Sequence, residues 1–149
     1  MLLITAIGIC NCLQAQDRER VIDSLVNLLN QSKADTNRAR LYIMIGDRYE
    51  QRNDSLAIDY YYKGIALSSE LQYKWGEAVG RQYLGEVYLR KNKYDSAMLH
   101  LTGAMELSKQ LKDDKRIGHN ASAIALVYNQ TGDYEKALQY YLQAAHHWE

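Results

Sequence analysis

Apolar residues recur along most of this chain at the three-to-four-residue spacing of an amphipathic α-helix. The first clear stretch is residues 17–31, where Val21, Leu25, Leu28 and Leu29 share that spacing. A polar break follows, and helical spacing then continues to the end of the chain. We therefore predict a leading helix over residues 17–31, which would cover the open end of the helices that follow.

After this break the helical pattern repeats with a period of about forty residues. A fixed period in this range is the signature of stacked helical repeats. We assign three repeats, residues 36–72, 73–112 and 113–149, each with two helices joined by a turn. The matching positions are Tyr88 and Tyr128; Tyr94 and Tyr134; Ala57, Ala97 and Ala137; Tyr61 and Tyr141; and Gly64, Ala104 and Ala144.

Each repeated position has a physical reason. Small residues in both helices would let a pair approach closely, and a tyrosine beside them would fill the remaining space. Glycine or asparagine at the turn would adopt the left-handed conformation that ends a helix. The small positions are Gly46, Gly85 and Ala125, then Ala57, Ala97 and Ala137; the tyrosines are Tyr49, Tyr88 and Tyr128; and the turn residues are Asn53, Asn92 and Gly132.

The motifs Gly85-x-x-Tyr88 and Gly132-Asp133-Tyr134-x-x-Ala137, followed by Ala144, resemble the tetratricopeptide repeat. The resemblance covers residues 36–149 and implies an all-α fold, a right-handed α-solenoid of antiparallel helix pairs that binds other proteins. That family has a period of about 34 residues and usually a proline after its second helix. Here the period is longer and proline is absent, so we expect longer second helices, as in the longer-repeat subfamily found in signalling scaffolds.

The resemblance also implies a concave binding face, lined by the first helices of successive repeats. Family members that bind chaperones hold a peptide's terminal carboxylate there with Lys and Asn; Asp47 and Glu86 would repel it, so we expect a different protein or peptide partner. Ordinary solvated helix faces would carry similar residues. By position, the face comprises Arg40, Ile43, Asp47, Glu50, Val79, Gln82, Glu86, Arg90, His119, Ser122, Leu126 and Asn129.

Composition and motifs argue against several other functions. Lys and Arg total 18, and Asp and Glu also total 18, so the basic excess typical of a nucleic-acid-binding protein is missing. The sequence has no phosphate-binding glycine loop and no nucleophile elbow. His146 and His147 are adjacent and would diverge on a helix, while His100 and His119 lack a second ligand one turn away. We expect no metal, no cofactor and no catalysis.

The N-terminus has a different pattern, an apolar run over residues 2–10. A membrane span needs about 20 apolar residues, whereas a short run followed by a small residue is typical of a secretory signal. We predict a signal peptide over residues 1–15, cleaved after Ala15, and export to the periplasmic or extracytoplasmic side of a bacterial membrane. No Lys or Arg precedes the run, and a disordered apolar tail is the alternative.

The last helix has an apolar face with no later sequence to cover it, formed by Tyr141, Ala145 and Trp148. Such a face marks a partner surface or an interrupted repeat array. We favour the second and expect the exported N-terminal sensor or scaffold region of a longer bacterial signalling protein, with membrane attachment through a downstream segment. The alternative is a free-standing envelope adapter or assembly factor that binds a peptide or protein in the concave groove.

Overall fold

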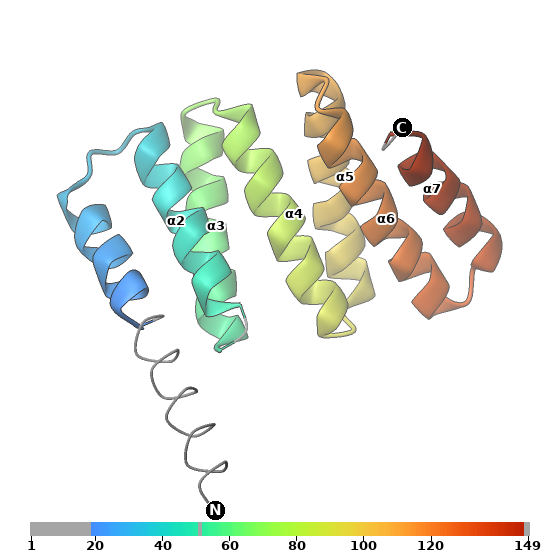
Figure 1. The fold of residues 1–149 in the computed structure, drawn as a ribbon, viewed down its shortest axis with the longest axis horizontal. Helices are drawn as coiled ribbons and strands as arrows, with labels where there is room; N and C mark the ends of the chain where they lie inside the picture. The colour runs from blue at the N-terminus through green and yellow to red at the C-terminus, as the bar shows by residue number, and fades with distance from the viewer. Residues whose placement is uncertain (1–18, 51, 148–149) are drawn as a thin grey trace, which may run out of the picture.

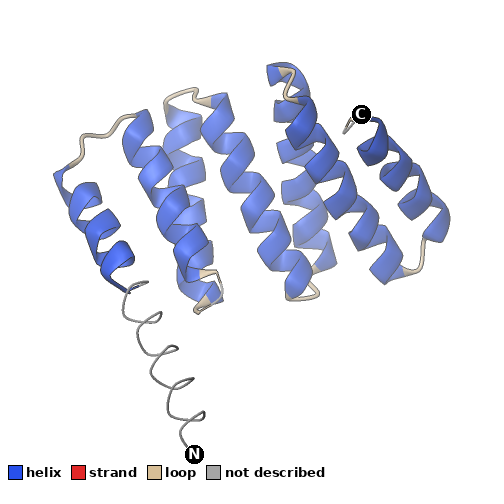
Figure 2. Cartoon of the chain, viewed as in Figure 1, coloured by secondary structure: helices blue, strands red, loops and turns tan. Residues whose placement is uncertain are grey.

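The computed structural model describes residues 19–50 and 52–147. A leading helix covers residues 19–31, and six further helices follow (Figure 1). Within the described ranges the chain has no strand (Figure 2). The six helices are α2 (Thr36–Tyr49), α3 (Asp54–Glu70), α4 (Lys74–Arg90), α5 (Tyr94–Leu111), α6 (Asp114–Thr131) and α7 (Tyr134–His146).

The helices form an α-solenoid. Each helix packs on the next one in the sequence, and α4 also contacts α2 and α6. In Figure 1, α2, α4 and α6 lie towards the viewer, and α3 and α5 lie behind them. The second helices α3, α5 and α7 begin at Asp54, Tyr94 and Tyr134, forty residues apart. The predicted all-α solenoid of helix pairs is therefore confirmed.

Small residues bring the two helices of each pair together, as the sequence pattern predicted. A Cβ atom added at Gly46 would lie 2.7 Å from Cε1 of Tyr61, and one at Gly85 would lie 2.6 Å from Cγ of Leu101. The alanines at the other small positions are buried. Only a residue without a side chain fits these two contacts, because the facing tyrosine and leucine are fully buried.

The repeated tyrosines of the first helices stack on aromatic rings of the second helices. The ring centroids of Tyr49 and Tyr60 are 5.7 Å apart, and those of Tyr128 and Tyr140 are 5.6 Å apart. In the middle repeat the partner of Tyr88 is an imidazole, His100, at 5.6 Å. The stacked pair therefore occupies the same place in every repeat, although one of its members changes from tyrosine to histidine.

The turn prediction was correct for two residues and wrong for Asn53. Asn92 and Gly132 have positive φ angles of 57° and 85°. Asn53 has a φ of −155° and caps α3, where its side-chain oxygen accepts hydrogen bonds from two backbone N–H groups. The reason is that Ala57 follows Gly46 by eleven residues, whereas Ala97 follows Gly85 by twelve, so that Asn53 takes the place of the capping residue Asp133. The turns between repeats also use left-handed residues, at Gln72 and Lys112.

The second helices α3 and α5 are long, as expected, and the first helices α4 and α6 are equally long. The first helices α4 and α6 have 17 and 18 residues, and the second helices α3 and α5 also have 17 and 18. The additional residues of a repeat are therefore not confined to its second helix.

The leading helix packs on α2 with two of the four predicted residues, Leu25 and Leu29. Ile22, Leu25 and Leu29 are buried, whereas Val21 and Leu28 are exposed. Leu25 and Leu29 form one core cluster with Ile45 of α2. Ile22 has helical spacing to Leu25 and Leu29 that is as good as that of Val21 to Leu25 and Leu28, and only the position of α2 decides which of these residues are buried. The predicted residues 17 and 18 lie outside the described range.

One face of α7 is exposed. Tyr134 and Leu142 are 69% and 63% exposed, and Leu138 and Tyr141 are also exposed. Tyr61, at the position of Tyr141 in the first repeat, is fully buried and stacks on Tyr83 of the following helix α4. The difference arises because no described helix packs on the outer side of α7. Trp148, which we assigned to the same face, lies outside the described residues.

No helix within the described ranges is both long enough and apolar enough to cross a membrane. The predicted signal peptide, residues 1–15, lies outside those ranges.

Candidate protein-binding groove

The first helices α2, α4 and α6, together with the leading helix, carry a row of three depressions, which we call the groove. One lies between the leading helix and α2, one between α2 and α4, and one between α4 and α6. Nine of the twelve residues predicted for the binding face line a depression or lie on its rim. Nevertheless, the side chains of Ile43, Val79 and Gln82 are buried. These three residues support the groove floor and present little surface to a partner.

The depression between α2 and α4 is small and mainly apolar, with a volume of about 140 Å³. Ile43 and Val79 form its floor, and charged side chains stand at its ends. It therefore suits one large apolar side chain with polar groups beside it. Its lining residues are Arg40, Ile43, Met44, Asp47, Trp75, Val79 and Tyr83.

Trp75 joins all three first helices. The guanidinium carbon of Arg40, from α2, lies 5.7 Å from the Trp75 ring centroid, and that of Arg116, from α6, lies 5.4 Å from it. Both distances are within the range of cation–π attraction. Arg116 also donates a hydrogen bond of 2.9 Å to Oε1 of Gln82. Trp75 is still 37% exposed, so an indole ring held in a fixed orientation remains available in the groove.

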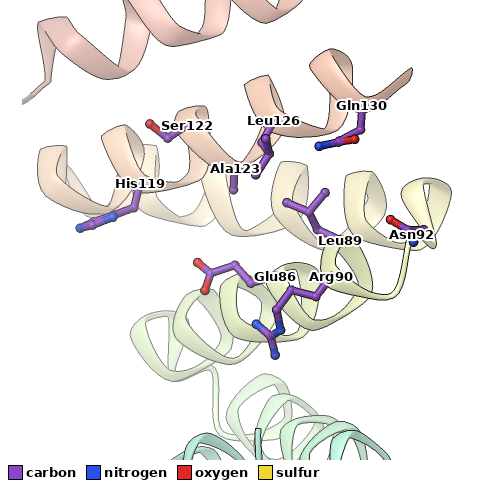
Figure 3. Close-up of a pocket in the computed structure, with 9 residues that line it drawn as sticks. All are labelled: Glu86, Leu89, Arg90, Asn92, His119, Ser122, Ala123, Leu126 and Gln130. Carbon is purple, nitrogen blue, oxygen red and sulfur yellow. The ribbon is translucent and has the colours of Figure 1, made fainter. Parts of the chain in front are cut away.

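The depression between α4 and α6 is larger, about 540 Å³ (Figure 3). Figure 3 shows the Glu86 carboxylate pointing into this space from α4, with Ala123 and Leu126 facing it from α6. Nε2 of Gln82 donates a hydrogen bond of 3.0 Å to Glu86. Burial raises the pKa of Glu86 above its ordinary value, although Gln82 and the charge of Arg90 act in the opposite direction.

The guanidinium of Arg90 forms an ion pair with a carboxylate other than that of Glu86. It lies 3.1 Å from Oε2 of Glu50, and Figure 3 shows it turned away from Glu86. Oε1 of Glu50 accepts a hydrogen bond of 2.8 Å from the hydroxyl of the buried Tyr61. Burial, followed by the charge of Glu50, raises the pKa of Tyr61, so this hydroxyl stays protonated and continues to donate. The Glu50–Arg90 pair thus bridges the first and second repeats at the groove.

The remaining predicted residues lie on the third repeat and at the ends of the groove. His119, Ser122 and Leu126 line the α4–α6 depression, and Arg40 and Asp47 line the α2–α4 depression. Asn129 is exposed near the end of α6. The structure therefore brings the predicted residues of all three repeats to one side of the solenoid.

Sequence reasoning missed several groove residues. Some are neighbours of predicted positions, and a wider stripe along each helix would have found them. Trp75 is different, because the residue forty positions later is Lys115. No tryptophan is repeated at this position, so the period could not reveal it. The missed residues around the two depressions between first helices are Met44, Trp75, Tyr83, Leu89, Asn92, Arg116, Ala123 and Gln130. Those in the depression beside the leading helix are Leu28, Gln31, Ser32, Asn37 and Leu41.

The described residues contain no cluster of three or more His, Cys, Asp or Glu side chains that could hold a metal ion. The rings of His146 and His147 are 5.7 Å apart and inclined at 59°. Nδ1 of His147 instead lies 3.1 Å from a carboxylate oxygen of Asp114. The two histidines therefore do not face a common ion.

Comparison with known proteins identifies the helix pairs. The profile of the family described as Tetratricopeptide repeat matches residues 84–115 and 121–149. The two matched segments are therefore assigned to the tetratricopeptide repeat family. It is also similar to human Tetratricopeptide repeat protein 29, with 29% identity over 102 residues, which are 68% of this chain and 22% of that relative. The match thus spans about a fifth of the relative's length.

Tetratricopeptide repeats generally mediate binding between proteins, and their all-helical fold is typically a non-enzymatic scaffold. Stacked repeats create an extended surface from many short elements. The matched repeats therefore point to a scaffold for protein–protein interaction, and the groove across the first helices is the candidate binding surface.

Proposed function

We propose that the groove binds an extended segment of a protein partner, without catalysis and without nucleic acid. The observation that carries this proposal is the half-exposed Trp75, held between two arginines beside an apolar depression. Tryptophan and arginine are enriched among the residues that dominate binding energy at protein interfaces. A fixed indole also loses little conformational entropy when a partner covers it.

Site-specific photocross-linking tests this proposal. A benzoylphenylalanine residue is placed at Leu126 in the groove, and a matched one at Leu99 on α5, since both leucines are exposed. In cells that make the chain, the residue at position 126 should capture a defined partner and the one at position 99 should not. The additional change Trp75→Ala should reduce the capture. Equal capture at both positions would contradict binding in the groove.

We further propose that the chain is the exported N-terminal sensor or scaffold region of a longer bacterial signalling protein. The apolar run before Ala15 supports export. The exposed face of α7 supports further repeats, because Tyr61 and Leu101, at the position of the exposed Tyr141 in α3 and α5, are fully buried. N-terminal sequencing of the mature protein should begin at Gln16. A mature protein that keeps Met1 in the cytoplasm would contradict export.

A free-standing envelope adapter or assembly factor is the second candidate. In that case the apolar face of α7 would be a docking surface rather than an internal contact between repeats. The genomic reading frame separates the two candidates. Continuation into more repeats, a membrane span and a kinase or DNA-binding domain supports the signalling protein, and a stop codon after Glu149 supports the adapter.

A further inference from the structure

The depression between α4 and α6 contains a carboxylate without a matching cation. Glu86 accepts its hydrogen bond from Gln82, a neutral amide. No ion pair joins Glu86 to another residue in the described ranges. A half-buried carboxylate of this kind costs free energy until a positive charge approaches it.

The nearest arginine on the same helix is not available to supply that charge. Arg90 is one turn from Glu86, but its guanidinium pairs with Glu50 at 3.1 Å. Glu50 is itself largely buried, with its side chain 16% exposed. Moving Arg90 to Glu86 would therefore leave a second buried carboxylate without its cation.

The opposite wall of the depression carries two apolar side chains, Ala123 and Leu126, together with the polar residues His119, Ser122 and Gln130. The charges of His119 and Arg90 both act to lower the pKa of Glu86, but the opposite effect of burial is larger. Leu126 and Ala123 face Glu86 across the depression, and Leu89 lies beside them on α4 (Figure 3). Apolar walls next to a carboxylate match a side chain with a methylene stem and a cationic end.

We propose that this depression binds a lysine or arginine side chain from an extended segment of the protein partner, with Glu86 as its counterion. The inference rests on the proposed function of the groove and specifies the chemistry of its ligand. The methylene stem packs against Leu89, Ala123 and Leu126, and the cationic group donates hydrogen bonds to Glu86. The depression, about 540 Å³ in volume, accommodates either side chain.

Selection from a random dodecapeptide library displayed on phage tests this site directly. The full chain and its Glu86→Gln variant are used side by side, because glutamine keeps the shape and the contact with Gln82 but removes the charge. Peptides selected on the unmodified chain should share a lysine or arginine at one position, and those selected on the variant should not. Glu106→Gln, which changes an exposed glutamate on α5, is the matched control and should leave the preference unchanged.

One selected peptide then provides the quantitative test. Replacing its basic residue by norleucine should weaken binding to the unmodified chain roughly ten- to hundredfold, the range for hydrogen bonds between charged groups. The same replacement should change binding to the Glu86→Gln chain less than threefold. Glu86→Asp, which keeps the charge, should retain part of the preference and serves as the second variant if Glu86→Gln does not fold.

The outcomes separate this inference from the function on which it rests. If the selected peptides share no basic residue but bind the Trp75→Ala variant more weakly than the unmodified chain, the cation site is overturned and binding in the groove stands. If no peptide is enriched, or if binding is indifferent to Trp75→Ala, both the cation site and peptide binding in the groove are overturned.

Discussion

Two glycines inside helices should respond in opposite directions to the same substitution. Gly85 lies in α4 and Gly103 in α5. A methyl group at Gly85 would lie 2.6 Å from Cγ and 2.9 Å from Cδ2 of Leu101, and 3.3 Å from the carbonyl oxygen of Ala97. The three atoms nearest to a methyl group at Gly103 would all belong to the Arg81 side chain, at 3.4–3.8 Å. The first site is closed by buried atoms, whereas the second is bordered by a flexible chain.

The expected magnitudes follow from these contacts. Alanine favours a helix over glycine by about 1 kcal/mol, and Gly103→Ala should gain most of that free energy. Gly85→Ala gains the same amount but forces the fully buried Leu101 to move, and overpacking of this kind costs about 1–3 kcal/mol. We therefore expect Gly103→Ala to be more stable than Gly85→Ala by about 1–3 kcal/mol.

Urea unfolding followed by circular dichroism measures both free energies. The double variant Gly85→Ala/Leu101→Ala supplies the internal check, since the shorter side chain removes the obstacle. In the Leu101→Ala background, Gly85→Ala should no longer destabilise the chain, so that the two changes are not additive. If Gly85→Ala alone stabilises as much as Gly103→Ala, the close packing of α4 on α5 is refuted.

Three further predictions concern buried side chains. Ala97→Leu should cost about 1–3 kcal/mol through overpacking; an unchanged melting temperature would mean that the repeat alignment is wrong. Tyr61→Phe should lower the free energy of unfolding in urea by roughly 1–2 kcal/mol, because Glu50 loses the hydrogen bond of 2.8 Å from the Tyr61 hydroxyl but keeps its ion pair with Arg90. An unchanged free energy of unfolding would contradict the hydrogen bond between Tyr61 and Glu50. Stability should fall as the pH drops below about 6.5, because burial and then Arg81 lower the pKa of His100, so the unfolded chain binds the proton first. His100→Phe should remove this part of the pH profile, and an identical profile would contradict the assignment.

The repeat architecture could be predicted from the sequence because it is a local property copied three times. The small residues at positions 46, 85 and 125 and the stacked tyrosines are required inside every helix pair, whatever the neighbouring pair does. Their period therefore revealed the solenoid. The error at Asn53 has the same origin: it was aligned as a turn residue, whereas the first repeat has one residue fewer between Gly46 and Ala57, which makes Asn53 the capping residue of α3.

The repeat period could not predict the contacts between different repeats. Trp75 aligns with no equivalent residue, and its two arginines come from different repeats. The unpaired state of Glu86 depends on Arg90 turning towards Glu50 of the preceding repeat.

The sequence by itself determined the class of the fold, the division into helix pairs and the side of each first helix that faces the groove. The tertiary structure decided which of those residues are buried, which of the two helical faces of the leading segment packs on α2, and which charges remain without a partner. The physical reason is that periodicity specifies the direction of a side chain from its own helix, whereas burial and charge pairing depend on how successive helix pairs are placed against one another.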